Sequence, residues 1–136
     1  MEKIVWDDAL YSVGHSHMDS HHKHLIDLVN SLVELNDQIA LAGAPTSPHI
    51  TEYQKIVVAI SNYINLHFSV EEALLQSVNY PYLHEQTMAH SQYVDAVAGF
   101  YVESDIAQLS EVVAYLGSWV INHILIEDMK YKDFVR

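Results

Sequence analysis

The 136-residue sequence contains no cysteine, and only six lysine and arginine residues stand against 18 aspartates and glutamates. The absence of cysteine excludes disulfides, zinc sites with thiolate ligands, iron–sulfur clusters and cysteine nucleophiles. The net charge of −12 argues against nucleic acid or an anionic membrane surface as a partner, because both attract clustered positive charge. No apolar run approaches the length of a membrane span, and the N-terminus lacks the apolar core of a signal peptide. These features predict a cytoplasmic protein.

Breakers divide the sequence into helical segments. Residues 43–48 (GAPTSP) are the strongest breaker, and Asn79-Tyr80-Pro81 predicts a turn. Between breakers, apolar residues recur every three or four positions, which is the period of a helix with one buried face. The pattern predicts an N-terminal non-helical arm over residues 1–17 and then helices at about 19–41, 51–77, 83–102 and 106–129.

The short connections between these helices make sequential neighbours antiparallel. We therefore expect one all-α domain over residues 1–136, folded as an up-down-up-down antiparallel four-helix bundle. Asp19 or Ser20 is the predicted N-cap of its first helix.

Ten histidines are the anomaly of the composition, and some of them recur at one level of the predicted bundle. The starts of helices one and three meet the finishes of helices two and four at the same end. The polar residues that fall within two or three turns of that end are His22, His67, Glu71, His90, His123 and Asp128. The apolar register turns them inward, and burial without partners would cost several kcal/mol in total. A metal centre resolves that cost.

The ligand types narrow the choice of metal. Imidazoles with carboxylates that can bridge, and no thiolate, suit iron or manganese, and also copper or zinc. No glutamate has a histidine three residues later, which excludes the Glu-x-x-His pattern of ferritin-like di-iron bundles. The His-Glu-x-x-His zinc motif is absent as well.

Four stretches together carry a specific resemblance. They are residues 19–25 (DSHHKHL), residues 67–72 (HFSVEE), Tyr80-Pro81 followed by a helix with His90, and residues 123–128 (HILIED). The chain resembles the hemerythrin family over nearly its whole length, and bacteriohemerythrins in particular. Myohemerythrin is itself a standard example of the four-helix bundle.

The resemblance implies two non-haem iron ions joined by an oxo or hydroxo group, with Glu71 and Asp128 as bridging carboxylates. It implies that His22 and His67 hold the iron that is open to O₂, and that His90 and His123 hold the other. Trp119, Leu25 and Ile26 are candidates for the wall of the O₂ pocket. We predict that the remaining histidines lie in solvent rather than on metal: His15, His17, His21, His24, His49 and His84.

One position departs from the family pattern. The family places a histidine four residues before the one that corresponds to His90, and this chain has Gln86 there. Gln86 binds weakly, or water fills the position, or His84 is drawn in by an irregular start of the third helix. A second open position would favour autoxidation and loss of metal, which argues against long-lived O₂ carriage.

The function that follows is O₂ binding at a di-iron centre, either for O₂ supply or for O₂ or redox sensing through a fused or separate signalling module. The alternatives are a di-iron enzyme that handles peroxide or nitric oxide, and an iron-binding or storage protein. An enzyme is less favoured, because the sequence offers no nucleophile or acid–base pair outside the metal site.

Overall fold

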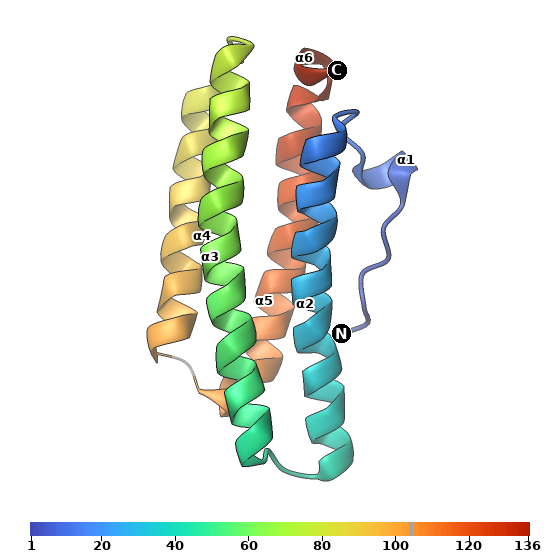
Figure 1. Cartoon of the computed structure of the whole chain (residues 1–136), viewed down its shortest axis with the longest axis vertical. Helices are drawn as coiled ribbons and strands as arrows, with labels where there is room; N and C mark the ends of the chain where they lie inside the picture. The colour runs from blue at the N-terminus through green and yellow to red at the C-terminus, as the bar shows by residue number, and fades with distance from the viewer. Residues whose placement is uncertain (104) are drawn as a thin grey trace.

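The computed structural model describes residues 1–103 and 105–136, and the side chains of all of these except 101–103 and 125. Within these residues four long helical segments run antiparallel to their sequence neighbours, which confirms the predicted all-α bundle (Figure 1). The first three are α2 (Ser16–Ala42), α3 (Ser47–Ser77) and α4 (Leu83–Glu103). The fourth is built from η1 (Ile106–Gln108), α5 (Leu109–Asn122), η2 (His123–Glu127), η3 (Asp128–Tyr131) and α6 (Lys132–Val135). No described helix has the length and hydropathy needed to cross a membrane.

The helices enclose one long apolar core. Helix α2 packs against α3 and α5, and α3 packs against α4. Val29, Leu32, Ile60 and Ile64 are 0% exposed along the middle of this core. Fully burying such a side chain contributes about 1.5–3 kcal/mol, so this stripe supplies much of the bundle's stability. A second, smaller apolar cluster closes the end where α2 begins, and its buried members are Val13, Met18, Leu75, Tyr80, Tyr131 and Val135.

Helices α2 and α3 both begin several residues earlier than the sequence pattern predicted, and a histidine takes part in the N-terminal cap of each. His15 is the N-cap of α2, and its Nδ1 accepts a hydrogen bond from the Met18 backbone N–H at 3.2 Å. The predicted cap at Asp19 or Ser20 is therefore wrong. Helix α3 begins at Ser47, not near Thr51, because Thr46 and His49 form a capping box in which His49 Nδ1 accepts from the Thr46 N–H at 3.1 Å. Proline in a first turn costs no hydrogen bond, so the apparent breaker at 43–48 lets the helix begin inside it.

The N-terminal arm is tied to α2 at two levels. The Asn30 side chain both donates to and accepts from the Ile4 backbone, each at 2.8 Å. The Asp19 carboxylate accepts from Ser12 Oγ at 2.6 Å and from the Val13 N–H at 2.9 Å. The arm also contains a one-turn helix, α1 (Asp8–Tyr11), so the prediction that it is wholly non-helical is wrong. The physical reason is the Asp7 side chain, which caps this turn by accepting from the Ala9 N–H.

Candidate metal centre

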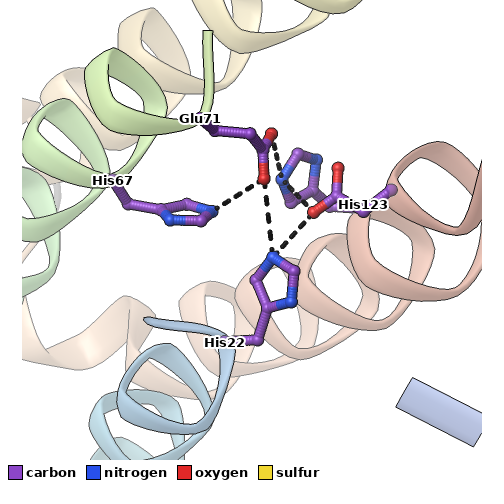
Figure 2. A group of neighbouring side chains, drawn as sticks. His22, His67, Glu71 and His123 are labelled. Atoms are coloured by element: carbon purple, nitrogen blue, oxygen red, sulfur yellow. Dashed lines mark ion pairs between the residues drawn. The ribbon is translucent and has the colours of Figure 1, made fainter. Parts of the chain in front are cut away.

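Three of the long helical segments bring five buried side chains to one point. His22 comes from α2, His67 and Glu71 from α3, and His123 and Asp128 from the end of the fourth segment. Each offers one ligand atom, and these atoms all lie within 4.8 Å of one another. Each of the five is 0% exposed. Figure 2 shows the histidine rings pointing from their separate helices toward the Glu71 carboxylate.

The two oxygens of Glu71 face different imidazoles. Oε2 lies 3.3 Å from His67 Nε2 and 3.5 Å from His22 Nε2. Oε1 lies 2.9 Å from His90 Nε2, which α4 contributes, and 3.7 Å from His123 Nε2. The carboxylate therefore stands between one pair of imidazoles on α2 and α3 and a second pair on α4 and the fourth segment.

Asp128 completes this arrangement from the opposite side. Its Oδ2 lies 2.8 Å from His22 Nε2 and 3.0 Å from His123 Nε2, so it reaches one member of each pair. Its Oδ1 accepts a hydrogen bond from Gln86 Nε2 at 2.7 Å. Both carboxylates thus contact both pairs of histidines.

A π-helical turn makes the position of Asp128 possible. In an α-helix, residues five apart are about 500° apart in rotation, so His123 and Asp128 would point about 140° away from each other. Segment η2 is a π-helix, and the Asp128 N–H donates to the His123 carbonyl five residues earlier. The wider turn brings both side chains to one face. Such π turns occur often at functional sites.

Further hydrogen bonds orient the ligands from outside. Tyr131 Oη donates to Glu71 Oε2 at 2.9 Å. His123 Nδ1 lies 3.0 Å from Glu127 Oε2, and the other Glu127 oxygen accepts from Tyr93 Oη at 2.9 Å. A carboxylate behind a ligating imidazole fixes its tautomer and makes its other nitrogen a stronger ligand.

The electrostatics of the cluster push its groups toward opposite charges. Burial opposes the protonated form of His22, but the carboxylates of Asp128 and Glu71 outweigh burial and raise the pKa of His22 to about 9. The same balance, led by Asp128, raises the pKa of His123 well above its ordinary value. Burial lowers the pKa of His67, with Glu71 acting against this shift. Burial also disfavours ionised Glu71, yet the close imidazoles of His22, His67 and His90 hold the pKa of Glu71 well below its usual value.

The donor set fits a metal, because several buried ligand atoms lack hydrogen bonds among the described residues. These atoms are Nε2 of His22, His67 and His123, and Oδ2 of Asp128. The His22 and Asp128 atoms are 2.8 Å apart but do not form a hydrogen bond with each other. Unpaired buried polar atoms cost about 1–3 kcal/mol each. A cation between them removes that cost.

Sequence comparison agrees with this geometry. The profile of the hemerythrin HHE cation binding domain matches residues 13–135. The chain belongs to the hemerythrin family. It is 28% identical to a bacteriohemerythrin of Clostridium acetobutylicum over 137 residues, which cover 96% of this chain and 99% of that protein. A bacteriohemerythrin of Stenotrophomonas maltophilia is 27% identical over 140 residues, covering 100% of this chain and 84% of that protein.

Structural comparison shows the same fold. The crystal structure of wild-type hemerythrin superposes with a TM-score of 0.78 at 22% sequence identity, covering 98% of each chain. The described residues therefore share the fold of hemerythrin.

Gln86, the departure from the hemerythrin pattern, lies inside the cluster. It is 6% exposed, and its Nε2 donates to Asp128 Oδ1 at 2.7 Å and to Glu71 Oε1 at 3.1 Å. His84 is exposed at the regular start of α4. The alternative in which His84 is drawn into the site is therefore wrong. Gln86 contacts both carboxylates from the position of the missing imidazole.

His21 is buried, and the prediction that it lies in solvent is wrong. Its Nδ1 lies 2.9 Å from Nδ1 of His67, and its ring packs against Tyr63 of α3. The buried face of α2 is wider than a narrow stripe, because Met18, His21, His22, Leu25 and Ile26 are all buried. Burial, followed by the charges of His67 and His17, lowers the pKa of His21 to about 4.

The other histidines lie apart from the cluster. His17, His24 and His84 are exposed, whereas His15 and His49 are half-buried. The last two cap helices, as described above. The contact between His21 and His67 had no signal in helix periodicity, but the capping role of His49 could have been read from its place three residues after Thr46.

The side chains expected around an O₂ pocket are buried near the ligands. Leu25 and Ile26 are 1% and 3% exposed in the main core. Trp119 is 4% exposed and stacks on His123, with ring centroids 5.7 Å apart at 17°. Trp119 therefore packs beside the imidazole pair of His90 and His123.

Proposed function

We propose that this chain holds two non-haem iron ions, joined by Glu71, Asp128 and an oxo or hydroxo group, and binds O₂ at the position served by His22 and His67. One observation carries the proposal: the two Glu71 oxygens face two separate pairs of imidazoles. A carboxylate that served a single ion would not need a second pair of imidazoles around its other oxygen. Family membership and the imidazole–carboxylate donor set support iron.

Ferrous ions at such ligands supply electrons and an open coordination position for O₂. The part of the protein is to hold each imidazole with its Nε2 lone pair facing inward. Glu127 does this for His123, and His21 does it for His67, because each contacts the Nδ1 atom on the far side of the ring. Tyr131 holds the Glu71 carboxylate in place by donating to Oε2.

Apolar side chains pack against the proposed ligands. Phe68 stacks flat on His90, with centroids 3.8 Å apart and an interplanar angle of 1°. Leu25 and Ile26 lie one turn beyond His22 on the same buried face of α2. An apolar wall favours a small neutral molecule such as O₂ over ions, because ions lose their hydration on entry.

Two physiological uses are open to such a centre: O₂ supply, and O₂ or redox sensing in the cytoplasm. We favour sensing, because the ligands come from four different helical segments, so a change at the centre changes the packing of all four. A fused or separate signalling module would read that change. The replacement of the family's histidine by Gln86 fits a centre that is oxidised by O₂ and reduced again better than one that stores O₂.

A cavity beside Gln86 supports a second candidate, a di-iron enzyme for peroxide or nitric oxide. It has a volume of about 410 Å³, and its lining residues are Tyr80, Tyr82, Glu85, Gln86, Ala89, Glu127 and Lys130. Gln86 thus separates solvent in this cavity from the two carboxylates. A larger cavity of about 640 Å³ lies near Ile50 and Ile106, at the opposite end of the bundle, and has no ligand of the cluster in its wall.

Metal analysis and an optical spectrum of the air-exposed protein test the proposal. We expect two irons per chain and the absorption of an oxo-bridged ferric pair, which changes when the iron is reduced and then exposed to O₂. One iron per chain, or a spectrum unaffected by O₂, contradicts the proposal. Turnover of peroxide or nitric oxide by the same preparation would favour the second candidate.

A further inference from the structure

A line of imidazoles leads from the surface of α2 to the buried cluster. His17 is exposed, His21 is 9% exposed and His67 is 0% exposed. The rings of His17 and His21 have centroids 4.5 Å apart, and Nδ1 of His21 lies 2.9 Å from Nδ1 of His67. Nε2 of His67 then faces Glu71 at 3.3 Å. In the proposed function His67 is a ligand and His21 orients it, whereas His17 has no role.

We propose that His17 and His21 form a second site, at the surface, for a divalent transition-metal ion such as Ni²⁺, Zn²⁺ or Cu²⁺, and that this site and His67 compete through one shared proton. Spacing of four places both rings on one helical face. Imidazole is a good ligand for these metals. His17 is exposed and can rotate to bring its nitrogen to an ion that His21 also binds.

The geometry of His21 leaves one atom for such an ion. Its Nδ1 faces His67, so only Nε2 can bind. That atom is not among the enclosed, unpaired atoms of the buried histidines, and the ring of His21 contacts the ring of exposed His17. His24 follows His21 by three residues, but its ring contact among the described residues is with Tyr63, with centroids 4.3 Å apart, and not with another histidine. The rings of His17 and His21 do contact each other, so this pair is the site.

The shared proton makes the two sites exclusive. A neutral imidazole carries one N–H and one nitrogen lone pair. Because the two Nδ1 atoms are in hydrogen-bond contact, one proton lies between them. When His67 holds that proton, its Nε2 can bind a buried ion, while Nε2 of His21 carries a proton and cannot bind. When His21 holds it, the reverse is true.

This exchange needs no net gain or loss of protons. The Nδ1 proton moves from one ring to the other, and each Nε2 exchanges its own proton with a neighbouring donor or water. The surface pair therefore binds an ion while the buried centre is empty and loses affinity when the centre is filled. The surface site stands without the proposed function, but its competition with His67 depends on the buried centre.

Titration of the full chain with Ni²⁺ tests the surface site. The metal-free protein is compared with its His17→Ala variant, and His84→Ala, another exposed histidine, is the matched control. Besides any nickel held by the empty buried cluster, we expect a nickel site whose dissociation constant rises tenfold or more in His17→Ala and stays unchanged in His84→Ala. Equal nickel binding by wild type and His17→Ala overturns the site.

The competition is tested on iron-loaded protein of measured iron content. We expect the surface pair to bind nickel at least tenfold more weakly than in the metal-free protein, and equal affinity overturns the shared proton. If no iron is retained, the proposed function has failed. Nickel binding is then measured on the metal-free His67→Ala variant, whose helix content is checked by circular dichroism. Without a shared proton this variant must bind nickel at least as tightly as wild type, and weaker binding overturns the competition.

Discussion

The backbone N–H of Asp128 bonds to the carbonyl of His123, five residues earlier, where an α-helix would bond residues four apart. This single extra residue turns both side chains toward Glu71. It also changes the rotation of everything that follows. Tyr131, whose hydroxyl reaches Glu71, depends on it as much as Asp128 does.

Deletion of Ile126, an exposed residue inside the π turn, tests this dependence. The deletion leaves Asp128 four residues after His123, where a regular α-helix places the two side chains about 40° apart on one face. We expect both irons to be kept, with helix content by circular dichroism nearly unchanged, because an ordinary α-helical turn then does what the π turn does in the longer chain. Ile126→Ala keeps the residue count and must also keep both irons. Loss of iron after the deletion but not in Ile126→Ala would show that the π turn itself is required.

Replacement of either bridging carboxylate should abolish two-metal binding. Glu71→Ala and Asp128→Ala each remove oxygens that face both imidazole pairs. His49→Ala is the control, because it removes a cap and costs about 1 kcal/mol of stability without touching the cluster. Metal analysis by mass spectrometry decides the matter. Two irons in both carboxylate variants, or lost iron in His49→Ala, would contradict the assignment.

Gln86→His should strengthen the second metal position. The substitution places an imidazole one turn before His90, where the amide now contacts Glu71 and Asp128. We expect slower removal of iron by a chelator and slower autoxidation, each by several-fold. His84→Ala is the control, because that ring lies outside the cluster. Unchanged rates in Gln86→His would mean that Gln86 is not beside the metal.

The contact of Glu127 with His123 should control metal affinity. Glu127→Ala removes the acceptor that holds Nδ1 of His123. Loss of such a partner behind a ligating histidine weakens metal binding by about 10–100-fold. Competition with a coloured chelator measures this change. Glu111→Ala, at an exposed position of α5, should have no effect, and an equal effect there would reduce the result to general surface charge.

Stability of the metal-free protein should be greatest near pH 6.5. The raised pKa values of His22 and His123 give stability that is present below about 6.5, the ordinary value, and is lost as pH rises, for His22 through about 9. The His22 shift corresponds to roughly 3 kcal/mol at 1.36 kcal/mol per pKa unit. The lowered pKa values of His21 and His67 act below 6.5, because the unfolded chain there binds protons that the folded chain refuses.

The low pKa of Glu71 adds to the acid limb, since its contribution is present above about 4.5 and lost below it. Urea unfolding at about pH 4, 6.5 and 9 measures both limbs. The iron-loaded protein should be more stable by several kcal/mol, because metal binds only the folded state. It should also show no loss between pH 6.5 and 9, where its histidines are already unprotonated. Equal curves with and without iron would exclude a buried centre.

The sequence was sufficient for the bundle and for the group of side chains at one end of it. Helix periodicity predicted which faces are buried, and short connections predicted the antiparallel order, so His22, His67 and His90 could be placed at one level. These inferences depend only on regular helix geometry. The structure brings all six candidate ligands together, while their role as metal ligands stays a prediction.

Irregular features could not be predicted in this way. Helix levels placed Asp128 and His123 at the same end of the bundle, but regular helix geometry turns the two side chains about 140° apart, so the π turn that brings them together had no signal in the periodicity. His21 was misassigned because its burial depends on Tyr63 and His67 of another helix. The early start of α3 was missed because a histidine, rather than glutamate, completes the capping box with Thr46. Each error arose where a tertiary or side-chain contact replaced the default of the local pattern.

The hydrogen bonds from the N-terminal arm to Asp19 should also affect how often the first turns of α2 open. Asp19 lies one turn before His22, and Ser12 and Val13 hold it at 2.6 and 2.9 Å. The first turns of a helix fray readily, and fraying here would carry His22 away from Glu71. By holding this turn, the arm sets how often the cluster opens. The lifetime of a bound ion therefore depends on residues that never touch it.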